Sequence, residues 1–398
     1  MTRQCDDDER LACAALTYLA EPSDLWLGKA VMSSGAAGTL DAIKAGRYAE
    51  KAAGSEAAKA AAGRAMARWQ VRLGEVPDAD DLAKFRSQGI RLICPGDPEW
   101  PSQLDDLGAG APYALWVRGN GDLRFGCLRS VAVVGSRAAT AYGSYVAAEI
   151  AASVAARGWT IVSGAAYGVD AAAHRGALGA GGVTVAVLAC GVDRPYPAGH
   201  KDLLDTIADT GVVVSEWPPG RNATRLRFLV RNRVIAALSA ATLVVEAGER
   251  SGALNTARHA RDMDRRLMAV PGPITSQQSA GCHTIIREWR GTLVTGAADV
   301  LEMVAPLGSG PDGSGPDGGG PDGGLPVAGR AKPVLARDAL DLESATVLDA
   351  LPTRGGIGTT AVATRAGLDP VTVVRCLGDL AASGFAERCE GGWRIRRS

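Results

Sequence analysis

The clearest indication of the fold is the segment Val131-Ala-Val-Val-Gly-Ser-Arg137. Its four apolar residues predict a buried strand, and the Gly-Ser-Arg that follows predicts a tight turn into a helix starting near residues 141–143. Short apolar runs alternate with Ala-rich helical stretches as far as residue 300. Because such strands are apolar on both faces and are separated by helices, the pattern predicts an α/β, extended Rossmann-like domain with a parallel-sheet core.

The remaining strands of this core are predicted from runs of the same kind. The candidates are Thr160–Val162, Val183–Leu188, Val212–Ser215, Thr242–Val245 and Leu267–Val270. Two further apolar runs, at 89–93 and 113–117, lie in a shorter bridge segment that leads into the core.

Composition divides the chain into four predicted regions. Residues 1–80 are Ala-rich with helical spacing and predict an N-terminal helical domain, and residues 81–305 hold the Rossmann-like domain with its bridge. Residues 306–337 predict a flexible linker, because Pro-Asp-Gly recurs at 311, 316 and 321 and the stretch 308–324 has no apolar side chain. Residues 338–398 predict three helices near 344–351, 359–366 and 370–383, then two short strands, which together make a C-terminal winged-helix domain.

The overall charge is balanced, with 43 Lys and Arg against 43 Asp and Glu in 398 residues. This balance argues against a polybasic nucleic-acid tail, yet residues 131–300 hold 17 basic and 13 acidic side chains. The eight cysteines form no CxxC pair, and acidic residues at 6–9 stand where a signal peptide needs positive charge. No apolar run approaches the ~20 residues of a membrane span, so we expect a soluble, cytoplasmic protein with reduced thiols.

Two strand-to-helix junctions are candidates for phosphate binding. The first is Gly135, Ser136 and Arg137, and the second begins with Ser163 and Gly164. Both follow predicted strands at their carboxyl ends, where helix N-termini offer amide donors to anions. The GxGxxG pattern of dinucleotide sites is absent, which disfavours a nicotinamide cofactor. The alternative at either junction is that the glycines only make turns.

A basic run supplies the third candidate. It comprises Arg221, Arg225, Arg227, Arg231, Asn232 and Arg233, and no acidic residue lies between Glu216 and Glu246. Arginines beside an Asn suit backbone phosphates, and Lys201 on another strand-to-helix loop could join the same surface. The alternative is a solvated helix face.

Catalytic signatures are missing from the sequence. His174, His200, His259 and His283 show no metal-ligand spacing, and HExxH is absent. We therefore expect no catalytic residue, no metal and no cofactor, and a protein that binds rather than an enzyme.

Residues 131–300 closely resemble the DNA-processing protein A family (DprA/Smf). The matching blocks occur in order and include Val133-Val-Gly-Ser-Arg137, Gly168-Val-Asp-Ala-Ala-Ala-His-Arg-Gly-Ala-Leu178, Ala186-Val-Leu-Ala-Cys-Gly-Val-Asp-Arg-Pro-Tyr-Pro197, Ser215-Glu-Trp-Pro-Pro-Gly220, Arg231-Asn-Arg233, Val244-Val-Glu-Ala247 and Gly281-Cys-His283.

The resemblance implies a protein that binds single-stranded DNA without sequence preference and helps load the RecA recombinase onto it during natural transformation and recombination. It also implies a homodimer formed through the Rossmann-like domain. The positions that match the family's DNA groove are Gly135, Ser136, Arg137, Lys201, Phe228, Arg231, Asn232 and Arg233. With Ser163 and Gly164 of the second junction, these are the predicted DNA-binding residues, and Phe228 could stack on a base.

The sequence departs from the family pattern at several places. Tyr167 stands where the family usually has Arg, Leu229 and Val230 replace Pro and Arg, and Asp264 replaces a Gly. The resemblance further implies an N-terminal domain of sterile-alpha-motif or helix-hairpin-helix type. There Glu21-Pro-Ser-Asp24 replaces a Gly-rich hairpin, and its two carboxylates would repel a phosphate.

Two other functions fit parts of the sequence. A phosphoribohydrolase shares the strand-to-Gly-Ser-Arg opening but needs a PGGxGT loop, where this chain has Val245-Glu-Ala-Gly-Glu-Arg-Ser-Gly252. A transcription regulator would use the winged helix to read duplex DNA, although its presumed recognition helix carries only Arg375. Nucleotide hydrolysis would support the first, and preference for a specific duplex the second.

Overall fold

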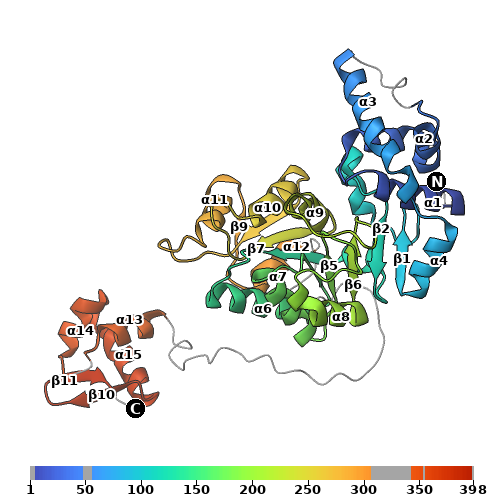
Figure 1. Ribbon diagram of the computed structural model, residues 1–398. Helices are drawn as coiled ribbons and strands as arrows, with labels where there is room; N and C mark the ends of the chain where they lie inside the picture. The colour runs from blue at the N-terminus through green and yellow to red at the C-terminus, as the bar shows by residue number, and fades with distance from the viewer. Residues whose placement is uncertain (1–4, 48–55, 306–341, 353–354, 397–398) are drawn as a thin grey trace. The chain divides into compact units, whose positions relative to one another are not determined.

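A computed structural model describes residues 5–47, 56–305, 342–352 and 355–396 (Figure 1). The chain forms two compact units, Met1–Gly315 and Pro316–Ser398. The linker predicted for residues 306–337 lies outside the described residues.

The first unit is built on a nine-stranded sheet in the order β1-β2-β6-β5-β4-β3-β7-β8-β9 (Figure 1). Its strands are β1 (Ile90–Ile93), β2 (Leu115–Arg118), β3 (Ser130–Val134), β4 (Thr160–Ser163), β5 (Thr184–Val187), β6 (Val212–Ser215), β7 (Ala241–Val244), β8 (Arg266–Ala269) and β9 (Thr292–Leu293).

Strands β3 to β9 pair in parallel, so the predicted core strands are confirmed. The two bridge strands change the character of the sheet, because β2 pairs antiparallel with β6 and β1 pairs antiparallel with β2. The sheet is therefore mixed rather than wholly parallel. Strand β9 is too short to give an apolar run and was not predicted from the sequence.

Helices cover both faces of this sheet. They are α5 (Leu123–Leu128), α6 (Ala141–Ala155), α7 (Val169–Gly179), α8 (Lys201–Thr210), α9 (Arg225–Ala237), α10 (Ala253–Asp262), α11 (Ala280–Glu288) and α12 (Ala297–Val304). Figure 1 shows α9, α10 and α11 on one face and α6, α7 and α8 on the other.

The alternation of side chains along β3 explains this sandwich. Val131 and Val133 pack into the apolar cluster that contains α6, α7 and α12. Ala132 and Val134 pack into the opposite cluster, which contains α9, α10 and α11. Since successive strand residues point to opposite faces, a run of apolar residues buries both sides of the strand.

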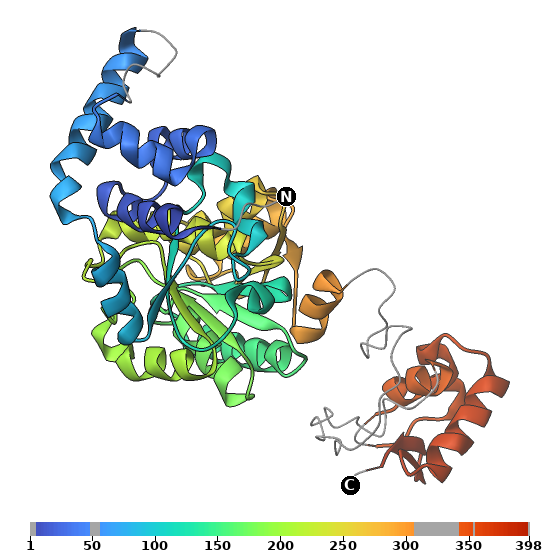
Figure 2. The same ribbon diagram turned by 90° about the vertical axis from the view of Figure 1, so that its right-hand side faces the viewer.

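The N-terminal helices pack at the β1 end of the sheet, as Figures 1 and 2 show. They are α1 (Asp7–Leu19), α2 (Leu25–Lys44), α3 (Glu56–Val71) and α4 (Ala79–Ser87). Helices α1 to α3 share an apolar cluster with Cys94, Tyr113 and Ala114 of the bridge. The predicted N-terminal helices are thus present, and they belong to the same compact unit as the sheet.

The second unit contains the elements predicted for the C-terminal region. They are α13 (Leu342–Ala350), α14 (Thr359–Ala366), α15 (Pro370–Ala382) and the antiparallel strands β10 (Ala386–Cys389) and β11 (Gly392–Ile395). Asp369 caps α15 by accepting hydrogen bonds from Val371 N and Thr372 N, and Pro370 occupies the first turn. Three helices followed by a hairpin is the element order of a winged helix, and that designation stays a prediction.

None of the helices in the described ranges is long and apolar enough to cross a membrane. Within the same ranges, no three His, Cys, Asp or Glu side chains are grouped so that they could hold a metal ion.

Candidate nucleic-acid interface

The two strand-to-helix junctions lie against each other at the carboxyl edge of the sheet. They follow β3 and β4, which are neighbours in the sheet. The Val169 N–H donates to the Ser136 carbonyl at 3.2 Å, which links the second junction to the first. Gly168 has a φ of +80°, and a Cβ at this position would overlap the Ser136 carbonyl. The second junction therefore needs Gly168 both for its backbone conformation and for the close approach of the two loops.

The first junction presents one free cation to the surface. Arg137 is exposed, and its guanidinium carbon lies 4.4 Å from the centroid of the Phe228 ring. Arg137 forms no ion pair with the described residues of the chain. A guanidinium over an aromatic face is held in place by the ring while its N–H donors stay available for an anion.

Phe228 is half-buried at the start of α9, and besides Arg137 it has an aromatic neighbour. The Tyr196 ring lies 5.3 Å from it, centroid to centroid, and Tyr196 is 46% exposed. Arg137, Phe228 and Tyr196 together are called the Arg–Phe–Tyr cluster below. Tyr196 lies within a block that matches the family pattern, but the sequence predicts no role for it. In the sequence, Tyr196 is an aromatic residue between two prolines on a strand-to-helix loop. This pattern alone does not indicate a site residue, because the contact with Phe228 depends on the position of the loop in the fold.

The second junction adds an exposed ring and a strained residue. Tyr167 is 53% exposed, and its ring lies 4.5 Å from the ring of His200 in an edge contact. The buried Ala165 has a φ of +54°, in the left-handed region that residues other than Gly rarely occupy. A nitrogen of the His200 ring lies 2.9 Å from the Ala165 carbonyl and fixes this turn. Tyr167 thus puts an aromatic face where the family usually has a charge.

Lys201 begins α8 directly after His200. Its ammonium is exposed and donates to Asp205 at 2.7 Å, and Asp205 also pairs with Arg118 of β2. The hydrogen bond to Asp205 raises the pKa of Lys201. Because exposed ion pairs contribute little net free energy, a phosphate could replace Asp205 as the partner of Lys201. Among the described residues, Lys201 has no hydrogen bond or ion pair with the Arg–Phe–Tyr cluster.

The side chains of Ser163 and Arg231 lie in the interior, which corrects the expectation that they form the groove surface. Ser163 is fully buried, and its hydroxyl donates to the Val133 carbonyl at 2.6 Å. Arg231 is 3% exposed, and its guanidinium donates to the carbonyls of Gly164, at 2.8 Å, and Val187. Burial lowers the pKa of Arg231 to about 10. These groups hold α9 against the ends of β4 and β5.

Asn232 and Arg233 are corrected in the same way. Arg233 is 4% exposed and donates two hydrogen bonds of 2.6 Å to the carboxylate of Glu216, which is also buried. Asn232 is 7% exposed and donates to the Gly252 carbonyl and to Asn255 Oδ1. The second half of α9 is buried on all sides. This part of the basic run therefore forms neither an exposed phosphate-binding surface nor a solvated helix face.

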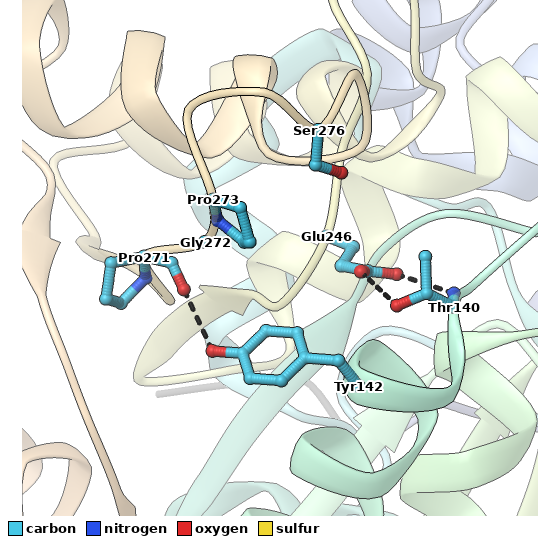
Figure 3. A pocket seen from close by; sticks show the side chains of 7 residues that line it. All are labelled: Thr140, Tyr142, Glu246, Pro271, Gly272, Pro273 and Ser276. Carbon is cyan, nitrogen blue, oxygen red and sulfur yellow. Dashed lines mark hydrogen bonds between the residues drawn. The ribbon is translucent and has the colours of Figure 1, made fainter.

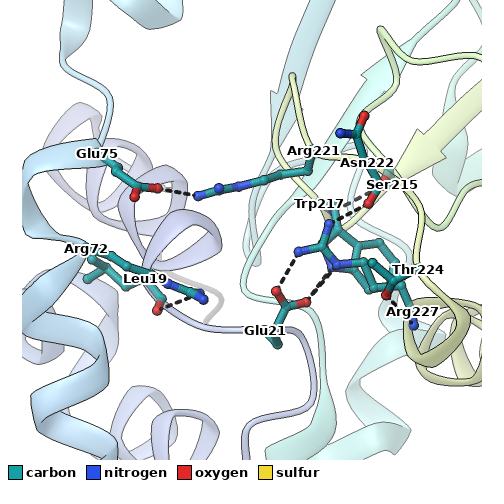
Figure 4. Close-up of polar contacts among 10 residues, drawn as sticks. All are labelled: Leu19, Glu21, Arg72, Glu75, Ser215, Trp217, Arg221, Asn222, Thr224 and Arg227. Carbon is teal, nitrogen blue, oxygen red and sulfur yellow. Dashed lines mark hydrogen bonds and ion pairs between the residues drawn. The ribbon is translucent and has the colours of Figure 1, made fainter.

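Two more arginines of the basic run contact the N-terminal helices (Figure 4). Arg227 donates to both carboxylate oxygens of Glu21, and Trp217 Nε1 donates to the same carboxylate at 2.9 Å. Arg221 pairs with Glu75 at 2.7 Å. Asp24, the other carboxylate of the segment 21–24, caps α2. Of the two acidic residues expected to repel a phosphate, Glu21 therefore links the α1–α2 loop to the sheet domain, and Asp24 caps a helix within the N-terminal region.

The other departures from the family pattern have local structural consequences. Leu229 and Val230 lie within the continuous helix α9 rather than in a loop. Asp264 has a φ of +54°, a conformation that a Gly would adopt without strain.

Comparisons with known proteins give one consistent family. The model of the family described as DNA recombination-mediator protein A matches residues 91–305. A putative DNA processing protein DprA of Mycobacterium tuberculosis is 42% identical over an alignment that covers 98% of this chain and 96% of that protein. DNA processing protein DprA of Streptococcus pneumoniae is also 42% identical, over 56% of this chain and 75% of that protein. The X-ray structure of the Streptococcus pneumoniae DprA superposes with a TM-score of 0.61 at 30% identity, covering 75% of this chain and 99% of that chain.

Proposed function

This chain belongs to the DNA recombination-mediator protein A family, and from that premise we propose that it binds single-stranded DNA at the Arg–Phe–Tyr cluster. The observation that supports this most directly is the exposed Arg137 guanidinium lying on the Phe228 ring at the carboxyl edge of the sheet. Arg137 supplies charge for a backbone phosphate, and the two rings supply faces on which bases can stack. Contacts of this kind do not distinguish one base from another.

The buried members of the predicted set take a supporting role in this proposal. Arg231, Asn232 and Arg233 fix α9, and α9 places Phe228 beside Arg137. Gly135 and Ser136 shape the first junction, where Ser136 N–H donates to the Glu246 carbonyl at 2.7 Å. Gly164 leaves the space that the Arg231 guanidinium fills. The DNA contacts are then made by few residues, chiefly Arg137 and Phe228, with Lys201 at the margin.

The test is fluorescence anisotropy with single-stranded and double-stranded oligonucleotides across salt concentrations. Arg137→Ala should weaken single-strand binding for every sequence and lower the slope of log Kd against log salt by about 0.7, the value for one phosphate contact on a single strand. Phe228→Ala should weaken binding with little change in that slope, because stacking releases no counterions.

Arg157→Ala is the matched control, since Arg157 is exposed just after α6 at the far end of that helix from the first junction. It should change neither affinity nor slope. Single-strand affinity that does not depend on salt, or that survives Arg137→Ala, would rule out the proposed surface.

Within the same proposal, the protein acts in the cytoplasm as a binding protein and not as an enzyme, and it loads a RecA recombinase onto single strands during DNA uptake and recombination. The family description, recombination mediator, supports this role. RecA strand exchange on strands coated with single-strand-binding protein should be faster when the chain is added, and no faster with Arg137→Ala. The homodimer through the Rossmann-like domain stays part of the proposal, and light scattering after gel filtration would give a monomer mass if it is wrong.

A further inference from the structure

A separate cavity opens at the carboxyl ends of β7 and β8, beside the N-terminus of α6 (Figure 3). Its volume is about 500 Å³, within the usual size of a small-ligand site. The residues that line it include Thr140, Tyr142, Glu246, Pro271, Pro273 and Ser276. Ligands of open α/β sheets bind at this edge, outside the carboxyl ends of the strands. None of these residues belongs to the Arg–Phe–Tyr cluster.

The charge of the cavity selects what can enter it. Glu246, which is 3% exposed, is the one charged side chain among the described residues that line it. Its carboxylate accepts hydrogen bonds from Thr140 N at 2.9 Å and Thr140 Oγ1 at 2.6 Å, one on each oxygen. Since each carboxylate oxygen can accept two hydrogen bonds, acceptor capacity is left for a ligand. The cavity therefore repels a phosphate and favours a neutral group that donates an N–H.

The walls of the cavity suit a flat ring. Tyr142 is 45% exposed, and its hydroxyl donates to the Pro271 carbonyl at 2.9 Å, which fixes the ring across the opening. Pro271 and Pro273 add apolar surface on the other side, as Figure 3 shows. A flat aromatic ligand can stack on such a ring, and the prolines would exclude water from its other face.

The cavity and the Arg–Phe–Tyr cluster share one loop. The loop 136–140 carries Arg137 near its start and Thr140 at its end. The same Glu246 holds both ends, since its carbonyl accepts from Ser136 N–H and its carboxylate from Thr140. Arg137 and Thr140 of the cavity lining are therefore only three positions apart on one loop.

We propose that this cavity receives one nucleobase, with the base ring against Tyr142 and an amino N–H donated to Glu246. For a base of the bound strand, this inference rests on the proposed function. Adenine, cytosine and guanine carry an exocyclic amino group, whereas thymine presents carbonyl oxygens on both sides of its one N–H and would meet the carboxylate less favourably. The cavity therefore adds a modest base preference to a surface that is otherwise indifferent to sequence.

The experiment compares oligo(dC) with oligo(dT) of equal length by anisotropy. Wild type should bind oligo(dC) more tightly by about tenfold or more, since about tenfold is near the lower end of what one hydrogen bond to a charged acceptor contributes. Ser276→Phe, which places a ring in the cavity, should remove this difference and leave oligo(dT) affinity unchanged. Thr275→Phe is the matched control, because Thr275 is exposed and does not line the cavity. It should keep the difference.

A second arm uses free cytidine and thymidine in saturation-transfer NMR, which separates the cavity from the strand. A cytidine signal that Ser276→Phe removes supports the cavity as a base site in its own right, even if no oligonucleotide binds and the proposed function fails. A preference seen with oligonucleotides alone supports a base delivered by the strand. Equal affinity for oligo(dC) and oligo(dT) in wild type, or a difference that survives Ser276→Phe, overturns the proposal while single-strand binding stands. If Ser276→Phe has a lower melting temperature than Thr275→Phe, Tyr142→Ala serves as a second variant that tests the same cavity.

Discussion

Burial assigns different roles to arginines that look alike in the sequence. Arg137 is exposed and lies on Phe228, Arg227 pairs with Glu21 on another part of the unit, and Arg233 is buried with Glu216. A buried ion pair is strongly destabilising when one partner is removed, because the other charge is left without compensation. Of these arginines, Arg137 is therefore the one whose loss should change DNA binding without changing the fold.

His174 gives a prediction at the residue scale. It is fully buried, its Nδ1 lies 2.7 Å from Thr184 Oγ1, and its Nε2 has no hydrogen-bond partner in the described chain. Thr184 Oγ1 donates to the Ile161 carbonyl, so His174 Nδ1 carries the proton between them. Burial lowers the pKa of His174 from 6.5 to about 3, so the folded protein holds this ring neutral.

As pH falls below 6.5, the unfolded chain takes up a proton at this histidine and the folded chain does not, so the free energy of unfolding falls. Between pH 7.5 and 5 this one group should lower the free energy of unfolding by roughly 2 kcal/mol, at about 1.4 kcal/mol per pKa unit. Urea unfolding at the two pH values should show the loss in wild type and a smaller loss, by that amount, in His174→Leu. An equal loss in both proteins would mean that His174 does not titrate as its burial requires.

At the scale of elements, the interface depends on how α9 is held against the sheet. The Arg231 guanidinium reaches beneath the second junction to the carbonyls of Gly164 and Val187. A Cβ on Gly164 would overlap that guanidinium. The glycine at this junction does more than make a turn, since it leaves room for the side chain that anchors the helix bearing Phe228.

Gly164→Ala should therefore displace Arg231 and lower the free energy of unfolding by about 1–3 kcal/mol, the usual cost of overpacking a core. Single-strand binding should weaken with it, because Phe228 moves with α9. Gly179→Ala is the control, since a Cβ placed there would meet nothing within 4 Å in the described residues outside its own helix backbone. If chemical denaturation gives the two variants the same stability, Arg231 does not anchor α9.

The helix α15 bears on the alternative of a duplex-reading regulator. Arg375 pairs with Glu343, and the neighbouring exposed residues Val371 and Val374 are apolar. Base readout in a major groove needs several polar side chains from one helix. The composition of this face gives no support to that alternative, which stays a prediction untested by the structure.

At the scale of the whole molecule, ion pairs join the N-terminal helices to the sheet within the first unit. Glu21 accepts from Arg227 and Trp217, and Glu75 from Arg221 (Figure 4). Burial by itself raises the pKa of Glu21, but the hydrogen bonds from Arg227 and Trp217 outweigh it, so the pKa lies below its ordinary value of 4.5. Glu21 is therefore ionised at neutral pH, and its contribution to stability is lost only when acid protonates it below that value.

Glu21→Gln should loosen this contact, because the neutral amide cannot pair with both guanidinium nitrogens. Hydrogen–deuterium exchange should become faster between α1 and α2 and in residues 217–227. High salt should move wild type toward the variant, since the carboxylate is about half exposed and is screened. Glu288→Gln, which removes an exposed pair with the adjacent Arg287, should leave these segments unchanged. Unaltered protection in Glu21→Gln would show that the Glu21 contacts do not hold the helices on the sheet.

The core strands, the helices between them and the two junctions at the sheet edge can be predicted from the sequence, because strand and helix periodicity and turn glycines are local properties of the chain. The resemblance also indicates Arg137 and Phe228 as site residues, which stays a prediction. The inward orientation of Ser163, Arg231 and Arg233 is visible only in the folded chain, since their burial depends on partners that lie elsewhere in the sequence, such as Val133, Gly164 and Glu216. The same holds for Tyr196 beside Phe228 and for Glu246 beneath Thr140. Sequence order cannot show those contacts, because a fold brings distant residues together and separates the neighbours of a single run.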